Sequence, residues 1–383
     1  MTLLLLNGGC PQPTIINETK TLQYFNHGRL MNINIGLWYP AEKPAAKSGL
    51  IIFSHGLGGS PKTYQTLIDC LVERGYIIVA PYHNDYLTTL NPLLPLRLNF
   101  RQLLTIFEDI LDNLRQINGY ENISLNELLD QIVDQCVAGL INNEAVVEVF
   151  SDAFAYRSQE LGLAIDLAIA FDRDETSRLY GIIDENKIAV AGHSMGGDTI
   201  LRKVIAGNPA YDPRIKAAVL MSPLSAWSKV ADIAVPTRWI TGTLDDPRLY
   251  PAIYQAFALS PGPSSLIDFY DVGHLTFSDA ACALHQLVAW LWPGLAISDK
   301  SFTADAESLA TDAESFAAGA SSPEVGEKLF RPIDFAATRN WQEKTEMINA
   351  ASADFFGFWL NGASSENNWL MTYQDWIFYF AEK

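Results

Sequence analysis

The chain has 383 residues, of which 49% are hydrophobic and 18% are charged. A chain of this size buries roughly three quarters of its unfolded surface, which excludes a disordered tail and a mini-protein. The 26 Lys and Arg residues stand against 44 Asp and Glu residues, a formal charge of −18. A surface with this much negative charge repels nucleic-acid phosphates and anionic lipid headgroups. Nucleic acid is therefore not expected as a partner.

The four cysteines form no recognisable metal or disulfide pattern, because the sequence has no CxxC and no Cys/His cluster. We therefore expect no metal and no cofactor. No apolar run reaches the length of a membrane span. The first ten residues, MTLLLLNGGC, are faintly similar to the end of an export signal but lack a basic segment. The sequence is compatible with a cytoplasmic protein and, if an export signal was trimmed, with a secreted or periplasmic protein. The oligomeric state is open as well.

Seven short segments have the pattern of β-strands. Residues 31–39 alternate apolar and polar side chains, which is the period of a half-exposed strand. Runs that are apolar throughout suit strands covered by helices on both faces. The sequence therefore predicts an α/β fold with a mainly parallel sheet, and ligand sites form at the carboxyl ends of such strands. The other expected strands are residues 50–53, 76–80, 188–191, 217–221, 237–241 and 266–270.

Two segments interrupt this order within one predicted domain, residues 1–383. Residues 91–156 repeat apolar side chains at helical spacing and carry a capping box at Ser124 and Glu127, which predicts a helical cap at the carboxyl edge of the sheet. Residues 299–330 form an acidic low-complexity insertion, for which a short amphipathic helix and a solvated loop are equally compatible. Their net charges of −7 and −5 account for most of the −18.

The sharpest chemical signal is Gly-His-Ser-Met-Gly-Gly at residues 192–197. It follows a predicted strand and precedes a helical stretch. A G-x-S-x-G between strand and helix is a nucleophile elbow, in which small residues allow a turn that exposes the serine hydroxyl. Ser194 is therefore the predicted nucleophile. The helix that begins here directs backbone N–H groups toward it, and the Met195 N–H is one predicted donor to an oxyanion.

A second glycine-rich loop, Ser-His-Gly-Leu-Gly-Gly at residues 54–59, follows the strand at 50–53. In this kind of fold the second oxyanion donor comes from the loop after an early strand, and we assign it to the Leu57 N–H. His55 is interpreted as a structural histidine, because the oxyanion donors are backbone groups. Gly58 and Trp227, the latter in the loop after residues 217–221, are the predicted substrate-binding residues.

In this kind of fold the general base and its acid follow the nucleophile in chain order. His274 lies directly after the strand at 266–270, whereas His285 lies within a helical pattern, so His274 is the predicted base. The acid is expected after the strand at 237–241, where Asp245 and Asp246 are adjacent. The spacing G-x-x-D favours Asp245, and Asp246 is the alternative.

The chain resembles the α/β-hydrolases grouped with platelet-activating-factor acetylhydrolase and the predicted dienelactone hydrolases, near bacterial polyesterases and cutinase-like enzymes. The likeness rests on WYPA, SHGLGG, GYIIVAPYH, GHSMGG and GHLTFSDAAC. It covers residues 33–90 and 157–287 and returns weakly at 348–362, which is similar to the closing helix of the family. The resemblance implies a Ser-His-Asp carboxylic ester hydrolase without a metal. Ser194 departs from the Cys nucleophile of true dienelactone hydrolases, and the cap departs from compact cutinase-like members.

These observations predict a serine esterase for hydrophobic, uncharged esters of short to medium chain length. Polyesters are a further candidate substrate. Two alternatives stand beside it: an interfacial lipase or phospholipase, which the cap would suit, and a catalytically silent binding protein on the same scaffold. The aromatic segment at residues 369–380 is interpreted as core or as a cover for a sheet edge.

Overall fold

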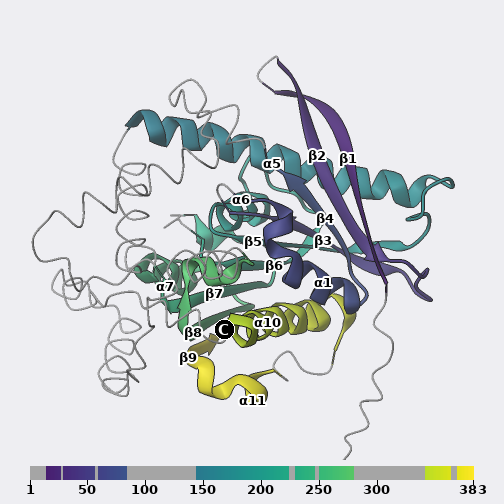
Figure 1. Ribbon diagram of the computed structural model, residues 1–383. Helices are drawn as coiled ribbons and strands as arrows, with labels where there is room; N and C mark the ends of the chain where they lie inside the picture. The colour runs from purple at the N-terminus through teal and green to yellow at the C-terminus, as the bar shows by residue number, and fades with distance from the viewer. Residues whose placement is uncertain are drawn as a thin grey trace, which may run out of the picture.

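The computed structural model describes residues 14–26, 29–56, 59–83, 144–223, 229–245, 250–279, 341–363 and 369–383. These residues form a nine-stranded sheet with the order β1-β2-β4-β3-β5-β6-β7-β8-β9 (Figure 1). The strands are β1 (Ile15–Asn26), β2 (Arg29–Pro40), β3 (Ser48–Ser54), β4 (Ile77–Tyr82), β5 (Ile183–His193), β6 (Ile215–Met221), β7 (Thr237–Leu244), β8 (Ser264–Gly273) and β9 (Ile377–Glu382).

The centre of the sheet is parallel and its two edges are antiparallel. From β4 through β8 each strand runs parallel to its neighbour, whereas β2 is antiparallel to β1 and β4, and β9 is antiparallel to β8. All seven predicted strands occur, and the predicted α/β-hydrolase fold with a mainly parallel sheet is confirmed. The structure adds β1 and β9. Because β9 pairs along β8, the C-terminal aromatic segment contributes the edge of the sheet.

Helices cover both faces of this sheet, which explains why its central strands are apolar throughout. In β3, Leu50 and Ile52 belong to one hydrophobic cluster, and Ile51 and Phe53 belong to the other. The first cluster is closed by α5 (Glu144–Arg173), α6 (Met195–Val204) and α7 (Tyr250–Leu259). The second is closed by α1 (Gln65–Glu73) and α10 (Trp341–Asn361), which lie side by side (Figure 1). Shorter elements are η1 (Pro61–Tyr64), η3 (Val230–Asp232), η4 (His274–Phe277), α11 (Leu370–Tyr373) and η7 (Gln374–Trp376).

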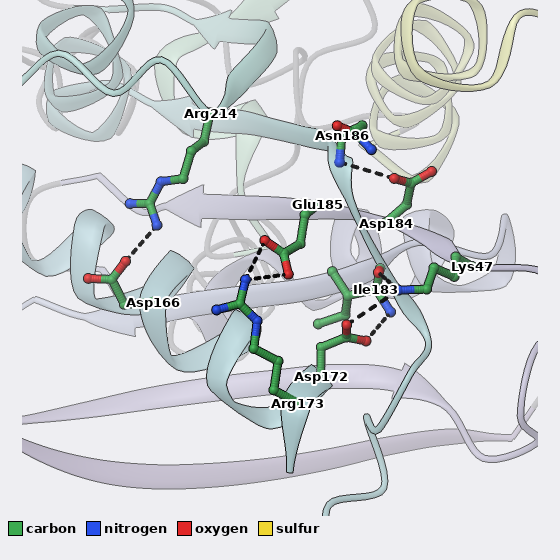
Figure 2. Close-up of polar contacts among 9 residues, drawn as sticks. All are labelled: Lys47, Asp166, Asp172, Arg173, Ile183, Asp184, Glu185, Asn186 and Arg214. Carbon is green, nitrogen blue, oxygen red and sulfur yellow. Dashed lines mark hydrogen bonds and ion pairs between the residues drawn. The ribbon is translucent and has the colours of Figure 1, made fainter. Parts of the chain in front are cut away.

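The C-terminal end of α5 is fixed to the beginning of β5 by polar contacts, which Figure 2 shows. Asp172 Oδ1 accepts the Ile183 N–H at 2.7 Å, and Lys47 Nζ donates to the Ile183 carbonyl at 3.0 Å. Arg173 donates to both carboxylate oxygens of Glu185, at 2.8 and 2.9 Å. The Arg173–Glu185 pair is exposed and adds little stability, whereas Asp172 satisfies a buried backbone donor. The helix therefore has a fixed position relative to the strand that ends at the nucleophile elbow.

The predicted cap and acidic insertion fall largely or wholly outside the described residues, so residues 91–143 and 299–330 stay predictions. The end predicted for the cap, residue 156, does not coincide with the end of an element, because α5 runs from Glu144 to Arg173. A helical pattern that continues into a core-facing helix gives no signal where an insertion ends. Within the part of the chain that the structure describes, no helix is both long enough and apolar enough to cross a membrane.

Replacing Phe356 by Ala is expected to lower the free energy of unfolding by about 3–5 kcal/mol, the usual cost of deleting a buried phenyl ring. Phe356 of α10 is fully buried and makes edge-on contacts with Tyr76 and Phe355, at centroid distances of 6.3 and 5.9 Å. Urea unfolding checks the value. Leu259→Ala is the control, since Leu259 is 61% exposed and its truncation should change stability by no more than about 0.5 kcal/mol. Equal effects of the two substitutions would contradict the packing described.

Candidate active site

Ser194 lies in the sharp turn between β5 and α6, as predicted. Its backbone has φ 55° and ψ −126°, a strained conformation for a residue other than glycine. The Ser194 N–H donates to the Met221 carbonyl of β6 at 2.8 Å, which fixes the turn to the neighbouring strand. Met195 is the first residue of α6 and is buried, so the N–H groups of the first helical turn lie beside Ser194. This geometry is that of a nucleophile elbow.

Two glycines make this turn possible. A Cβ atom at Gly192 would lie 2.7 Å from the Gly196 carbonyl oxygen, and a Cβ atom at Gly196 would overlap the carbonyl oxygen of Ser54 at the end of β3. The backbones of the elbow and of the loop after β3 are therefore in direct contact. Only glycine permits so close an approach at these positions.

The loop after β3 reaches Ser194 through Gly56. A Cβ atom placed on Gly56 would lie 3.4 Å from Ser194 Cβ and 3.3 Å from His193 Nδ1. Leu57 and Gly58, the next residues of the predicted oxyanion loop, lie outside the described residues. The predicted role of the Leu57 N–H therefore stays a prediction, and the structure supports it only by placing the preceding residue next to the nucleophile.

Tyr64 of η1 connects this loop to the elbow. Its hydroxyl accepts the Gly56 N–H at 3.0 Å and lies 2.8 Å from His193 Nδ1. Burial raises the pKa of Tyr64 to about 12, so the hydroxyl keeps its proton and donates it to His193. His193 Nδ1 is then the acceptor, and a neutral His193 carries its hydrogen on Nε2. Tyr64 and His193 have no role predicted from the sequence, because neither type of residue is fixed by a spacing rule.

His193, a residue of the elbow, contacts the predicted base. Its ring centroid is 4.7 Å from that of His274 and 5.4 Å from the ring of Phe277, on which it stacks. Burial, and then the neighbouring His274, lower the pKa of His193 well below its usual value. His193 therefore stays neutral and places no positive charge beside His274.

The predicted acid and base are brought together. His274 Nδ1 lies 2.8 Å from Asp245 Oδ1, and the Asp245 side chain is fully buried whereas His274 is partly exposed. Thr241 Oγ1 donates to the other Asp245 carboxylate oxygen at 3.4 Å, and the Asp245 N–H donates to the Gly242 carbonyl at 2.9 Å. Asp245, the residue that the G-x-x-D spacing favoured, therefore faces the base, and Asp246 lies outside the described residues.

A buried lysine of α10 holds the segment that precedes His274. Lys344 Nζ donates to the backbone carbonyl of Asp271 at 2.7 Å and to its carboxylate at 2.6 Å, and the Lys344 side chain is fully buried. Asp271 has φ 60°, a conformation that costs energy for a residue other than glycine. The Lys344 contacts oppose this cost. Sequence reasoning did not find this pair, since the two residues are 73 positions apart.

The remaining predicted residues have mixed outcomes. His55 is buried and hydrogen-bonded, with Nδ1 at 2.7 Å from the Gly56 carbonyl, which agrees with a structural histidine. Trp227 and His285 lie outside the described residues. Among the residues described, no group of three or more His, Cys, Asp and Glu side chains is placed to hold a metal ion. The expectation of no metal and no cofactor for the whole chain stays a prediction.

Acidification is expected to destabilise the native state through His193. The unfolded state binds a proton on this residue near pH 6.5, whereas the native state does not, because the pKa of the buried ring is lowered. Above about pH 6.5 the ring is neutral in both states, and His193 does not change the free energy of unfolding. Below this pH the free energy of unfolding falls by up to about 1.4 kcal/mol per pH unit. Urea unfolding from pH 8 to pH 5 should show this loss relative to His193→Asn, whose amide oxygen can still accept the Tyr64 hydrogen bond. If the free energy of unfolding depended on pH in the same way in both proteins, His193 would not be the cause of the loss.

Two parts of the chain match known protein families. Residues 141–256 match the family described as PET hydrolase-like, and residues 35–99 match platelet-activating factor acetylhydrolase, isoform II. The first range contains Ser194 and Asp245, and the second contains the loop after β3. His274 lies in neither range.

The matches to individual relatives cover less than half of each relative's own length. The chain is 24% identical over 212 residues to the platelet-activating factor acetylhydrolase of Canis lupus familiaris, which covers 52% of the chain and 40% of the relative. It is 35% identical over 89 residues to Cutinase est1 of Thermobifida alba, covering 23% of the chain and 27% of the relative. The chain thus spans less than half the length of these relatives. The chain therefore has an α/β-hydrolase fold, and parts of it are similar to serine esterase families.

Proposed function

We propose that the protein hydrolyses carboxylic esters through an acyl-enzyme formed on Ser194. The observation that carries this proposal is the strained elbow at Ser194, whose preceding residue His193 contacts the ring of His274, together with the 2.8 Å hydrogen bond between His274 and the buried Asp245. A serine hydroxyl held by such a turn, together with an oriented imidazole, suits nucleophilic catalysis. The matches to families named acetylhydrolase and PET hydrolase-like support the same chemistry.

Each group has a defined part in the proposed reaction. The Asp245 carboxylate accepts the Nδ1–H of His274, which makes Nε2 the nitrogen that takes the Ser194 proton. Ser194 Oγ attacks the ester carbonyl, and the Met195 and Leu57 N–H groups stabilise the resulting oxyanion. His274 then returns the proton to the leaving alcohol. A water molecule activated by the same imidazole hydrolyses the acyl-enzyme and restores Ser194.

The proposed substrates are hydrophobic, uncharged esters with short or medium acyl chains. The relatives divide between a platelet-activating factor acetylhydrolase and cutinases, which favours a short acyl group and leaves the alcohol part variable. A chain-length series of p-nitrophenyl esters beside a polyester film assay would separate a soluble esterase from a polyesterase. A jump in rate above the solubility limit of a triglyceride would instead identify an interfacial lipase.

Ser194→Ala is expected to reduce the hydrolysis of p-nitrophenyl butyrate to background, on the order of a 10⁶-fold loss in kcat for the serine of a catalytic triad. The variant should also lose labelling by a fluorophosphonate probe, which reacts only with an activated serine. Circular dichroism serves as the control for folding. A folded variant that hydrolysed the ester at the parental rate would refute the assignment, and an unlabelled parent would favour the silent binding protein.

Asp245→Asn is expected to lower kcat by about 10⁴-fold, because the amide cannot hold His274 in the required tautomer. Asp246→Asn is the matched control, since it removes an identical charge one residue away. Its kcat should stay within about threefold of the parent, since it leaves the tautomer of His274 unchanged. The reverse order of the two effects would assign the acid to Asp246.

A further inference from the structure

Helix α5 places two charged side chains, Arg157 and Glu160, beneath the loop that follows β3. Both are buried, with exposed fractions of 0% and 1%. They lie one helical turn apart and face the carboxyl ends of β3 and β4. A buried guanidinium loses its hydration, so it is retained only where hydrogen-bond acceptors replace the water.

The acceptors of Arg157 are backbone carbonyls of the predicted oxyanion loop. Arg157 Nη1 donates to the His55 carbonyl at 2.6 Å, and Nη2 donates to the Gly56 carbonyl at 3.4 Å. The two N–H groups belong to one planar, rigid guanidinium, so they hold two consecutive peptide groups in a fixed relation. The peptide group that contains the Gly56 carbonyl also contains the backbone nitrogen of residue 57.

Further donors converge on the same Gly56 carbonyl. It accepts the Gly59 N–H at 3.2 Å and lies 2.7 Å from His55 Nδ1. His55 Nε2 accepts the His83 N–H at 3.1 Å, so the hydrogen of a neutral His55 is on Nδ1, which donates. Three donors that surround one carbonyl oxygen oppose rotation of its peptide plane.

Glu160 fixes the neighbouring histidine. Its Oε2 lies 2.6 Å from His83 Nδ1, and its Oε1 accepts the Tyr24 hydroxyl at 2.6 Å. His83 Nε2 lies 2.9 Å from the hydroxyl of Ser54, the last residue of β3. The network thus extends from α5 through β4 to both ends of the Ser54–Gly56 segment, against which the elbow at Gly196 packs.

We propose that Arg157 is a positioning residue for the oxyanion step. It touches no substrate. It holds the peptide group after Gly56 in one orientation, and its positive charge on the carbonyl side polarises that peptide, which makes the N–H on the opposite side a stronger donor. The inference rests on the proposed ester hydrolysis, since it assigns a residue to one step of that reaction.

The experiment compares Arg157→Lys and Arg157→Gln with Arg238→Lys. Arg238 is a matched control because it is equally buried and also donates to a backbone carbonyl, that of Ala351 at 2.8 Å, at the opposite end of β7 from Asp245. Active sites are first titrated to the endpoint with a fluorophosphonate, so kcat refers to folded, reactive protein only. The readouts are kcat, KM, the thermal midpoint, and the inhibition constant of a trifluoromethyl ketone, which adds to Ser194 and mimics the oxyanion.

Arg157→Lys is expected to lower kcat by about ten- to a hundredfold, since lysine lacks the planar, rigid fork that fixes the two carbonyls relative to each other and the loss of one oxyanion donor costs about 10²–10³. KM should change by less than about threefold, and affinity for the trifluoromethyl ketone should fall in parallel with kcat/KM. Arg157→Gln, which also removes the charge, should have a larger effect. Arg238→Lys should lower the thermal midpoint but leave kcat per titrated site unchanged.

Three results would overturn the inference. One is a kcat for Arg157→Lys within twofold of the parent, and another is a loss of kcat without a matching loss of ketone affinity. The third is an equal loss of kcat in Arg238→Lys, which would reveal a general effect of removing a buried arginine. If Arg157→Gln does not fold, Arg157→Lys decides, because it keeps the charge. A parent that is neither labelled nor active refutes the proposed function itself, whereas an active parent with an unaffected Arg157→Lys refutes only the role of Arg157.

Discussion

The contact between the nucleophile elbow and the end of β3 is the constraint on which the rest of the site depends. Gly196 approaches the Ser54 carbonyl so closely that no side chain fits between them. Because β3 and β5 are adjacent parallel strands, with Ser54 paired to Gly192, the contact occurs where both strands end. The strained turn at Ser194 is therefore held between β6, which accepts its N–H, and the loop after β3. The packed sheet supplies the energy that keeps this strained turn in place.

Polar groups around the elbow are arranged so that charge is confined to a few positions. Tyr64 stays protonated and His193 stays neutral, because burial raises the pKa of the first and lowers that of the second. The buried carboxylate of Asp245 faces His274, and the buried ammonium of Lys344 faces Asp271. A neutral His193 ring beside His274 avoids a repulsive positive charge as the imidazolium forms during the proposed reaction.

The sequence predicted those parts of the site that follow from local rules. Ser194 was predicted from small residues at fixed offsets between a strand and a helix, and His274 and Asp245, with Asp246 as the alternative acid, from their positions after apolar runs. Tyr64, Arg157 and Lys344 were missed, because each acts through a partner that is distant in the chain: Tyr64 and His193 are 129 positions apart, and Arg157 and His55 are 102 apart. A lone Arg or Lys within a helical pattern gives no sign that it will be buried.

The fold shows the same division. Continuous apolarity in β3, β4 and β5 determined a sheet with two covered faces, since a strand exposed on one face would alternate. The sequence did not predict β1, because polar Glu18 and Lys20 stand at its partly buried positions, and it did not identify β9 as a strand, because its run IFYFA is apolar without alternation. Local sequence patterns predicted Ser194 and His274 for the proposed chemistry and left Asp245 and Asp246 as alternatives for the acid. Only the tertiary structure decided that Asp245 faces His274 and that a buried arginine holds the loop beside Ser194, because both depend on contacts between chain segments that no local pattern records.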